Sequence, residues 1–180
     1  MSIELRDFAA DDADAVNRIA LAAFRQYEEV YQDWEQVSQS IGRMVDLSKS
    51  GELIVAYLKG EVVGAVVYVA HDQPKPSFFL TEWPVIRMLV VEPKARGLGI
   101  GRALTKECVD RAIRDGAGLI ALHTSPIMKE AMGIYLSMGF RYHCEAPPLS
   151  GVPCAVYVKL LWPEAHDESE ANPLQLPANL

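Results

Sequence analysis

Three glycines and four basic side chains are concentrated in residues 94–106, which read KARGLGIGRALTK and contain no Asp or Glu. The window follows the apolar run 85–91 and leads into apolar residues spaced like one helix face, so the glycines stand where a strand turns into a helix. Glycine permits positive φ and close approach of a ligand to backbone N–H groups. Because a helix N-terminus adds unpaired N–H donors and partial positive charge, this window predicts a pyrophosphate site.

The spacing of the glycines excludes two common phosphate loops. A Walker A loop needs Lys-Ser/Thr after its last glycine, and Arg102-Ala103 follows Gly101 here; a GxGxxG fingerprint starting at Gly97 fails at Arg102. What remains, Arg96-x-x-Gly99-x-Gly101 after a strand, resembles the Gln/Arg-x-x-Gly-x-Gly/Ala signature of the GCN5-related N-acetyltransferases (GNAT family). That family binds the pyrophosphate of acetyl-coenzyme A (acetyl-CoA) with this loop. The alternative is an ordinary glycine-rich turn.

A second motif lies downstream, at residues 131–140. The segment AMGIYLSMGF resembles the A-x-x-x-Tyr-x-x-x-Gly-Phe segment of the same family and places Tyr135 at its tyrosine position. Taken alone, Tyr135 is better explained as a core aromatic on a helix face. Two motifs in the family's order favour an acyl-CoA site, and the resemblance covers residues 3–161.

The resemblance implies a role for particular residues. In the family an amine attacks the thioester carbonyl directly, in a ternary complex, and a strand amide, here that of Val90 or Val91, stabilises the oxyanion. The departing sulfur takes a proton from a tyrosine, here Tyr135. The expected cofactor-binding residues are Leu89, Val90, Val91, Arg96, Gly97, Leu98, Gly99, Ile100, Gly101, Arg102 and Met128.

The general base is less well defined. The strand carboxylate common in the family is replaced here by Val85 and Ile86, so Glu82 is the leading candidate, and a solvated turn carboxylate is the alternative explanation of Glu82. His123 is expected to be a strand-end residue, with a base as the alternative. Met128 stands where the family often has an Asn that contacts the pantetheine arm, a contact that Thr124 or Ser125 would then make.

Two features concern the acceptor. Arg87 interrupts an apolar strand and is expected to pair with a carboxylate of the fold; the alternative is that it anchors a carboxylate of the acceptor. Phe24, Tyr27, Tyr31 and Trp34 recur at helical spacing, which is typical of core. If the helix breaks near Glu28, the resemblance implies that the wall of the acceptor cleft is formed by Tyr31, Asp33 and Trp34 instead.

Periodicity and turn signals predict the elements that position these motifs. Strands are expected at 2–8, 52–58, 61–70, 78–91, 119–123, 140–144 and 155–161, and helices at 11–31, 34–49, about 100–115 and 127–138. This order, β-α-α-β-β-β-α-β-α-β-β, predicts an α/β (α+β) fold with a mixed, mostly antiparallel sheet and helices on both faces. It is also the GNAT order.

Composition limits the class of protein. We expect one domain at 1–161 and an acidic mobile tail at 162–180, which has four acids and no Lys or Arg. Net charge is −7, so no nucleic-acid partner is expected, and the longest uncharged apolar run, 62–70, is too short to span a membrane. Three cysteines without C-x-x-C spacing, and no evident signal peptide, favour a cytoplasmic location. The four histidines lack ligand spacing, so no metal is expected.

The leading hypothesis is therefore an acetyl-CoA-dependent N-acetyltransferase acting on a primary amine of a small molecule or peptide. A non-catalytic acyl-CoA-binding module is the alternative, which the missing strand carboxylate keeps open. A nucleotide-binding protein of another class is disfavoured by the glycine spacings. The acceptor is not identified, and a homodimer is left open.

Overall fold

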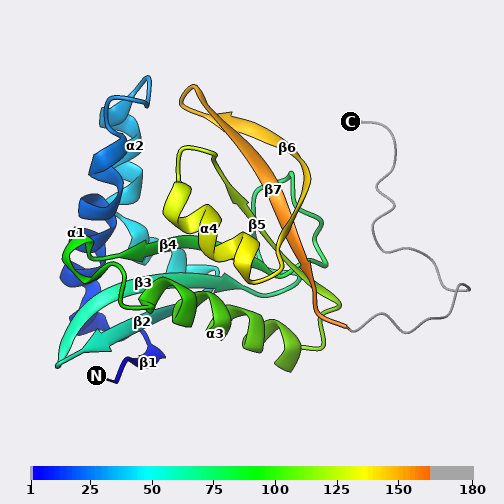
Figure 1. The fold of residues 1–180 in the computed structure, drawn as a ribbon, viewed down its shortest axis with the longest axis horizontal. Coiled ribbons are helices and arrows are strands. Elements are labelled where there is room, and N and C mark those ends of the chain that lie inside the picture. Colours follow the sequence, from blue (N-terminus) through cyan, green and yellow to red (C-terminus); the bar gives the residue numbers. More distant parts are fainter. Residues whose placement is uncertain (1, 163–180) are drawn as a thin grey trace, which may run out of the picture.

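One seven-stranded sheet organises the chain, and the computed structural model describes residues 2–162 (Figure 1). The strand order is β1-β2-β3-β4-β5-β7-β6, and every neighbouring pair is antiparallel except β4 and β5, which are parallel. The strands are β1 (Glu4–Asp7), β2 (Glu52–Leu58), β3 (Glu61–Val69), β4 (Val85–Val91), β5 (Leu119–Thr124), β6 (Arg141–Leu149) and β7 (Val152–Leu160).

Four α-helices cover the two faces of the sheet. They are α1 (Ala13–Phe24), α2 (Trp34–Ile41), α3 (Ile100–Arg114) and α4 (Lys129–Ser137). One buried cluster joins α1 and α2 to the sheet, and a second joins α3 and α4 to the opposite face. The predicted order of elements and the mixed sheet flanked by helices are confirmed. Among the helices of residues 2–162, none is both long and apolar enough to cross a membrane.

Three predicted boundaries are wrong, and each has a local cause. Helix α1 ends at Phe24 and is followed by a 3-10 turn, Arg25–Tyr27, and the second helix divides at Gly42 into α2 and the 3-10 segment Met44–Lys49. The strand expected at 78–91 begins only at Val85, because prolines remove backbone donors in the loop before it. Lys75 holds this loop closed by donating to the carbonyls of residues 70, 81 and 83 at 2.7–3.1 Å.

The C-terminal hairpin is longer than predicted. β6 and β7 extend into the segment between the two predicted strands and include its prolines. Prolines are tolerated at these positions because β6 is an edge strand and this part of β7 extends beyond β5. Their turn is Ser150-Gly151, and both residues have positive φ. The tip of the hairpin contacts the segment before α2: Gln32 N donates to Ser150 O (3.0 Å), and Asp33 N to Ser150 Oγ (2.8 Å). The expected tail lies, except for Trp162, outside the described residues.

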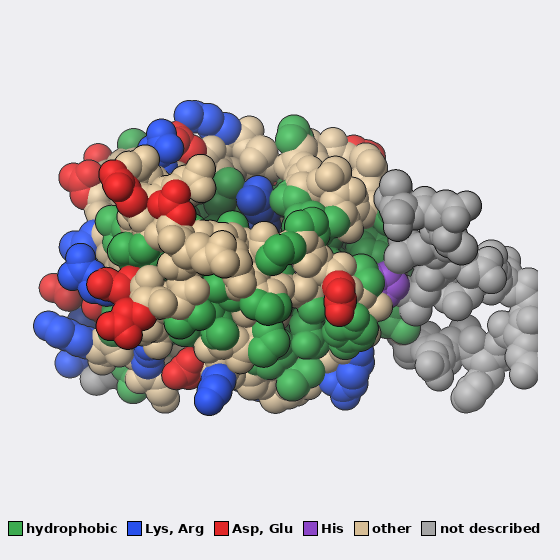
Figure 2. Space-filling view, turned by 90° about the horizontal axis from the view of Figure 1, so that it is seen from above, with side chains coloured by type: hydrophobic (Ala, Val, Ile, Leu, Met, Phe, Trp, Pro, Cys, Tyr) green, Lys and Arg blue, Asp and Glu red, His purple; other side chains and the backbone are tan. Residues whose placement is uncertain are grey.

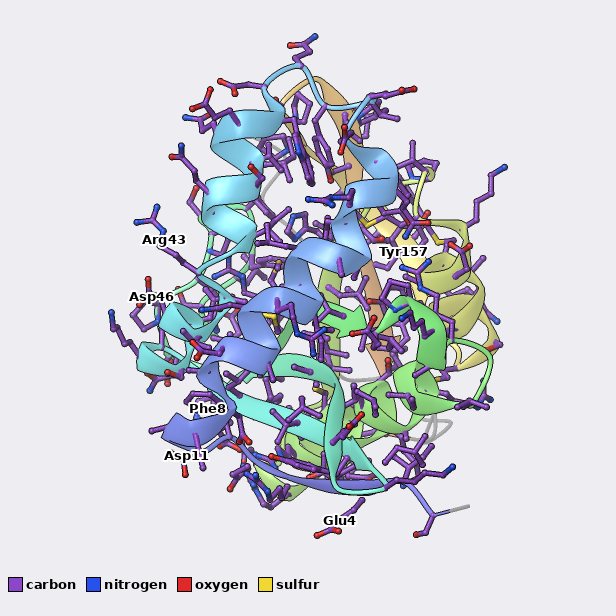
Figure 3. The ribbon with its side chains drawn as sticks, turned by 90° about the vertical axis from the view of Figure 1, so that its left-hand side faces the viewer. Glu4, Phe8, Asp11, Arg43, Asp46 and Tyr157 are labelled. Carbon is purple, nitrogen blue, oxygen red and sulfur yellow. The ribbon has the colours of Figure 1, made fainter. Side chains whose placement is uncertain are left out.

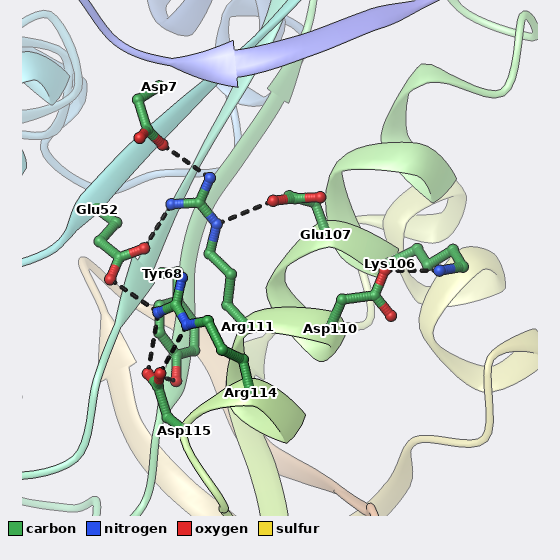
Figure 4. A network of polar contacts seen from close by, with 9 residues as sticks. All are labelled: Asp7, Glu52, Tyr68, Lys106, Glu107, Asp110, Arg111, Arg114 and Asp115. Carbon is green, nitrogen blue, oxygen red and sulfur yellow. Dashed lines mark hydrogen bonds and ion pairs between the residues drawn. The ribbon is translucent and has the colours of Figure 1, made fainter.

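A network of ions ties the N-terminal strands to α3 (Figure 4). The guanidinium of Arg111, with its side chain only 11% exposed, donates to Asp7 Oδ1 (2.7 Å), to Glu107 Oε1 (3.0 Å) and to Glu52. Arg114 adds a second bond to Glu52, at 3.1 Å. Hydrogen bonds to charged partners contribute more than neutral ones, so Arg111 holds β1 and β2 against the helix that carries the glycine loop.

Replacing Arg111 by Met is therefore expected to lower the free energy of unfolding by about 2 kcal/mol, because three carboxylates lose their shared donor while the apolar stem keeps its packing. Urea denaturation measures the change. The matched control is Lys106→Met, which removes an exposed pair with Asp110 and is expected to leave stability unchanged. Equal stability of the two variants would contradict a structural role for Arg111.

Candidate functional site

The parallel strands β4 and β5 pair over only two residue pairs, Val85–Ala121 and Ile86–Leu122. Beyond them β4 continues without a strand partner on that side. A β-bulge accompanies the separation: the register of β3 against β4 shifts between Ala65 and Val67, and Met88 has a φ of +52°. A non-glycine residue at positive φ is uncommon and costs conformational energy. The bulge was not predicted from the sequence.

One cavity, of about 370 Å³, lies between the glycine loop, the open side of β4 and the start of α4, and we call it the loop cavity. Of the eleven residues predicted to bind the cofactor, it is lined by Leu89, Val91, Arg96, Gly97, Gly99, Ile100, Gly101, Arg102 and Met128. Leu98 and Val90 are not among its lining residues: Leu98 is an exposed side chain, and the Val90 side chain is buried in the core on the α1–α2 face. The structure therefore brings nine of the predicted residues together.

The backbone of the glycine loop is shaped by positive φ angles. Gly97 and Gly99 have φ of +79° and +83°, and Gly99 is the residue before the first turn of α3. Among residues 2–162, no side chain caps this 15-residue helix, so the N–H groups of its first turn have no partner there. At Gly101 a Cβ would lie 2.9 Å from Ile134 Cδ1, which shows how closely α3 and α4 approach. These free N–H groups suit an anion.

The two arginines of the loop, Arg96 and Arg102, are already engaged by the protein. Arg96 donates to the carbonyl of Ala23 (3.2 Å) and to Gln26 Oε1 (3.3 Å), which fixes the loop to the end of α1. Arg102 donates to Ser137 Oγ (2.8 Å) on α4. The anion-binding capacity of the loop therefore rests mainly on its backbone.

A second cavity, of about 400 Å³, continues from the first, and we call it the helix cavity. Phe24, Leu89, Met128 and Ala131 line both. The other residues that line the helix cavity and bear on its chemistry are Tyr31, Arg43, Asp46, Arg87, His123, Thr124, Ser125 and Tyr135. Figure 2 looks down on this end of the molecule and shows a hollow in which a basic side chain lies among hydrophobic ones.

The break in the first helix brings aromatic residues to these cavities. Tyr27 lines the loop cavity, Phe24 lines both, and Tyr31 lines the helix cavity, where it stacks on Trp34 with ring centroids 6.0 Å apart. Among the described residues, the buried Tyr31 hydroxyl has no hydrogen-bond partner. Of the three residues predicted to form a wall if the helix broke near Glu28, Tyr31 lines the helix cavity, whereas Asp33 and Trp34 do not. The helix ends earlier than that, at Phe24, and Trp34 packs on the core.

Tyr135 lines the helix cavity, one helical turn after Ala131, which lines both cavities, and it is only 5% exposed. Its ring packs edge-on against Phe140, with centroids 5.7 Å apart. Burial raises the pKa of its hydroxyl, so the phenol stays protonated at neutral pH. The position of Tyr135 is compatible with both predicted roles, core aromatic and proton donor.

Arg87 is a partly buried cation in the helix cavity. The expectation that it pairs with a carboxylate of the fold is wrong for residues 2–162, in which no acid faces it closely enough to raise its pKa; burial alone lowers the pKa of the guanidinium. Among the residues that the structure describes, the only acid lining this cavity is Asp46, which is exposed and bound to Lys49 Nζ at 2.8 Å. Figure 3 shows Arg43 and Asp46 at the outer surface.

His123 lies beside Arg87 and against two aromatic rings. Its ring centroid is 5.2 Å from that of Phe78 and 6.0 Å from that of Phe79, both edge-on. Burial and the positive charge of Arg87 lower the pKa of His123 to about 4. The imidazole is therefore neutral at physiological pH, which makes it a weak base with a free hydrogen-bonding nitrogen.

Glu82 is not brought to either cavity. It lies exposed in the loop before β4 and lines neither of them. No motif indicated that Ala23, Gln26 and Glu130 line the loop cavity, because this depends on how α1, the 3-10 turn after it and α4 pack. The local indication was the aromatic stripe that begins at Phe24, the last residue of α1.

Comparison with known proteins agrees with this geometry. Residues 13–140, more than half of the chain, match the model of the acetyltransferase (GNAT) family. The chain is 31% identical over 88 residues to human N-acetylaspartate synthetase, covering 49% of this chain and 27% of that protein. It is 34% identical over 104 residues to mouse N-acetyltransferase 8B, covering 54% and 44%. The chain thus spans less than half the length of these curated relatives.

A solved structure gives the same fold. The structure of yncA from Salmonella typhimurium with its cofactor acetyl-CoA superimposes with a TM-score of 0.66, covering 94% of this chain and 99% of that one. Sequence identity is 17%, so this likeness concerns the fold alone.

The depressed pKa of His123 makes a prediction for stability. In the unfolded chain a histidine titrates near pH 6.5, so between pH 6.5 and about 4 the unfolded chain binds a proton that the folded chain does not. Stability therefore falls as pH decreases, and this residue alone is expected to remove about 2 kcal/mol between pH 7 and pH 5. In a His123→Gln variant, the free energy of unfolding measured by urea denaturation should therefore fall by about 2 kcal/mol less between pH 7 and pH 5 than in the unmodified protein.

The control for this prediction is His71→Gln, since His71 is exposed and lines neither cavity. It should keep the pH dependence of the unmodified protein. If His123→Gln also keeps it, the imidazole is not held neutral by its surroundings.

Proposed function

Because the chain belongs to the acetyltransferase (GNAT) family, we propose that it transfers an acetyl group from acetyl-CoA to a primary amine of a small molecule or peptide. The observation that carries this proposal is the pair of continuous cavities beside the open side of β4, one ending on the glycine loop and the other on Arg87 and His123. The proposal is also supported by the acetyl-CoA named with yncA. The loop cavity takes the donor and the helix cavity the acceptor.

The donor's pyrophosphate binds to the free N–H groups of the glycine loop and the first turn of α3. The helix N-terminus supplies partial positive charge, and the positive φ of Gly97 and Gly99 turns the backbone toward the anion. Arg102 stands close enough to reach a remaining phosphate, at the expense of its bond to Ser137.

The pantetheine arm lies along the open side of β4. Glu92 N donates to Val63 O on β3, so by alternation the N–H groups of Leu89 and Val91 face the other side, where no strand pairs with them. These two groups are available to the arm's amide and to the thioester carbonyl. Of the two amides expected for the oxyanion, Val91 is favoured over Val90 because Val90 turns toward β3.

The reaction is a direct attack. The neutral amine in the helix cavity adds to the thioester carbon, the carbonyl oxygen becomes an oxyanion bound by a β4 amide, and the carbon–sulfur bond then breaks. Tyr135, which is protonated and lines the helix cavity one turn after Ala131 of both linings, donates to the departing thiolate. The amine's proton leaves to water in the helix cavity, since Glu82 is exposed away from it. His123 is neutral and could accept it only weakly.

The alternative, an acyl-CoA-binding module without turnover, is favoured by one observation: no partly or fully buried carboxylate among the described residues lines either cavity to act as a base. Thiol release from acetyl-CoA with a panel of primary amines separates the two functions. Stabilisation by CoA, about 2.7 kcal/mol at 100 times its Kd, without thiol release for any amine would support the module.

Donor binding is tested at Gly99. Asn and Asp both tolerate positive φ and have the same size, so Gly99→Asn and Gly99→Asp differ mainly in charge. The negative variant is expected to weaken CoA binding by at least about 10-fold relative to the Asn variant, because it repels the pyrophosphate. Calorimetric titration with CoA measures both. Equal affinities would contradict placement of the pyrophosphate at this loop.

Tyr135 is tested by removing only its hydroxyl. Tyr135→Phe keeps the packing against Phe140 and is expected to lower kcat by about 10- to 100-fold with little change in KM for acetyl-CoA. Steady-state thiol release measures both constants. Tyr142→Phe, an exposed tyrosine outside both cavities, is the matched control and should retain full activity. Retention of kcat in Tyr135→Phe would leave the residue with a packing role only.

A further inference from the structure

The helix cavity contains a positive charge that the fold does not neutralise. Arg87 lines the cavity from β4 and has no ion pair or side-chain hydrogen bond within residues 2–162. The other partly buried arginines of residues 2–162 are paired: Arg6 binds Asp12, and Arg111 binds three carboxylates. An arginine in an apolar strand that is partly desolvated and unpaired is costly, and its guanidinium stays protonated.

The neighbours of Arg87 do not compensate for this charge. His123 is neutral and packs on Phe78 and Phe79, and Met88, turned by the bulge, packs against the same core cluster. The exposed Arg43 at the outer surface adds to the positive charge, and the Asp46 carboxylate is already held by a lysine. A ligand that enters this cavity therefore meets a desolvated guanidinium with several free N–H donors.

Tyr31 provides a second group without a partner. It lines the same cavity, and its buried hydroxyl has no hydrogen-bond partner among the described residues. Buried polar groups are normally satisfied, and the two residues together offer donors of the kind that a planar anion accepts. A cavity of about 400 Å³ has room for a molecule the size of an amino acid.

We propose that Arg87 binds a carboxylate of the acceptor, so that the acceptors of this protein are small amines that also carry a carboxylate, with Tyr31 as a second donor to the same group. This inference rests on the proposed function and specifies its substrate class. The guanidinium accommodates both carboxylate oxygens at once and thereby holds the amine toward the junction with the loop cavity. A buried site built to bind a charge discriminates strongly against an analogue that lacks it.

The test compares amino acids with their uncharged amides. Thiol release from acetyl-CoA is measured with the free amino acids and with the matching amino-acid amides, for the unmodified protein, Arg87→Gln and Arg25→Gln. The unmodified protein is expected to show kcat/KM at least about 30-fold higher for a free amino acid than for its amide. Arg87→Gln should reduce this ratio to within about threefold, mainly by lowering kcat/KM for the free amino acid.

Arg25→Gln removes the same charge from an exposed position that lines neither cavity, so it should keep the preference. Thermal unfolding of an Arg87→Met variant distinguishes a binding role of Arg87 from a structural one. Removal of an unpaired, partly buried charge is expected to raise the midpoint of thermal unfolding of the ligand-free protein, whereas loss of a structural ion pair would lower it. A lowered midpoint, or equal rates with acids and amides in the unmodified protein, would overturn the proposal.

A second measurement separates this inference from the proposed function. Thermal unfolding is followed in the presence of CoA with N-acetylated amino acids and with their amides. If no amine releases thiol, but an N-acetylated amino acid stabilises the unmodified protein and not Arg87→Gln, acetyl transfer fails and the carboxylate site stands. If amines are acetylated but neither rates nor stabilisation depend on Arg87, the function stands and the carboxylate site is wrong.

Discussion

The interruption of the hydrogen-bond ladder between β4 and β5 is the constraint on which the site depends. Backbone N–H and C=O groups inside a protein need partners, and β4 has none on its open side beyond Ile86. A β-bulge at Met88 lies in the same part of β4, where the register against β3 changes. Both cavities are lined by residues of β4 and share Leu89, so a ligand bound there lies where a neighbouring strand would otherwise pair.

The two cavities offer positive charge of different kinds. The glycine loop supplies partial charges from fixed backbone groups, which cost no side-chain ordering and are held in place by the bonds of Arg96 to the end of α1. The helix cavity supplies a full charge on a side chain, at Arg87. Apolar walls surround both, and in a low dielectric each interaction with an anion is stronger than in water. The arrangement suits a ligand that is anionic at its two ends and neutral where the cavities meet.

Those parts of the fold and site that have local causes could be predicted from the sequence. The glycine loop and Tyr135 were found because motif spacing fixes a strand–turn–helix and a helix face, and the element order followed from periodicity. The Met88 bulge could not be found, since a methionine at positive φ carries no sequence signal. Nor could the missing partner of Arg87, which depends on where every acid lies after folding. The end of β6 was predicted too early because prolines follow it in the sequence. Prolines are tolerated in an edge strand, and the edge position of β6 is known only from the topology.

The contact between the tip of the β6–β7 hairpin and the segment before α2 affects the order in which parts of the protein fold. Ser150 bonds to Gln32 and Asp33, so one wall of the helix cavity is fastened by residues far apart in the chain. During synthesis the first helices and the glycine loop emerge well before this hairpin, and contacts of such long range form late. The helix cavity, which the hairpin lines through Leu149 and Cys154, therefore reaches its final shape only when this hairpin has docked on the segment before α2.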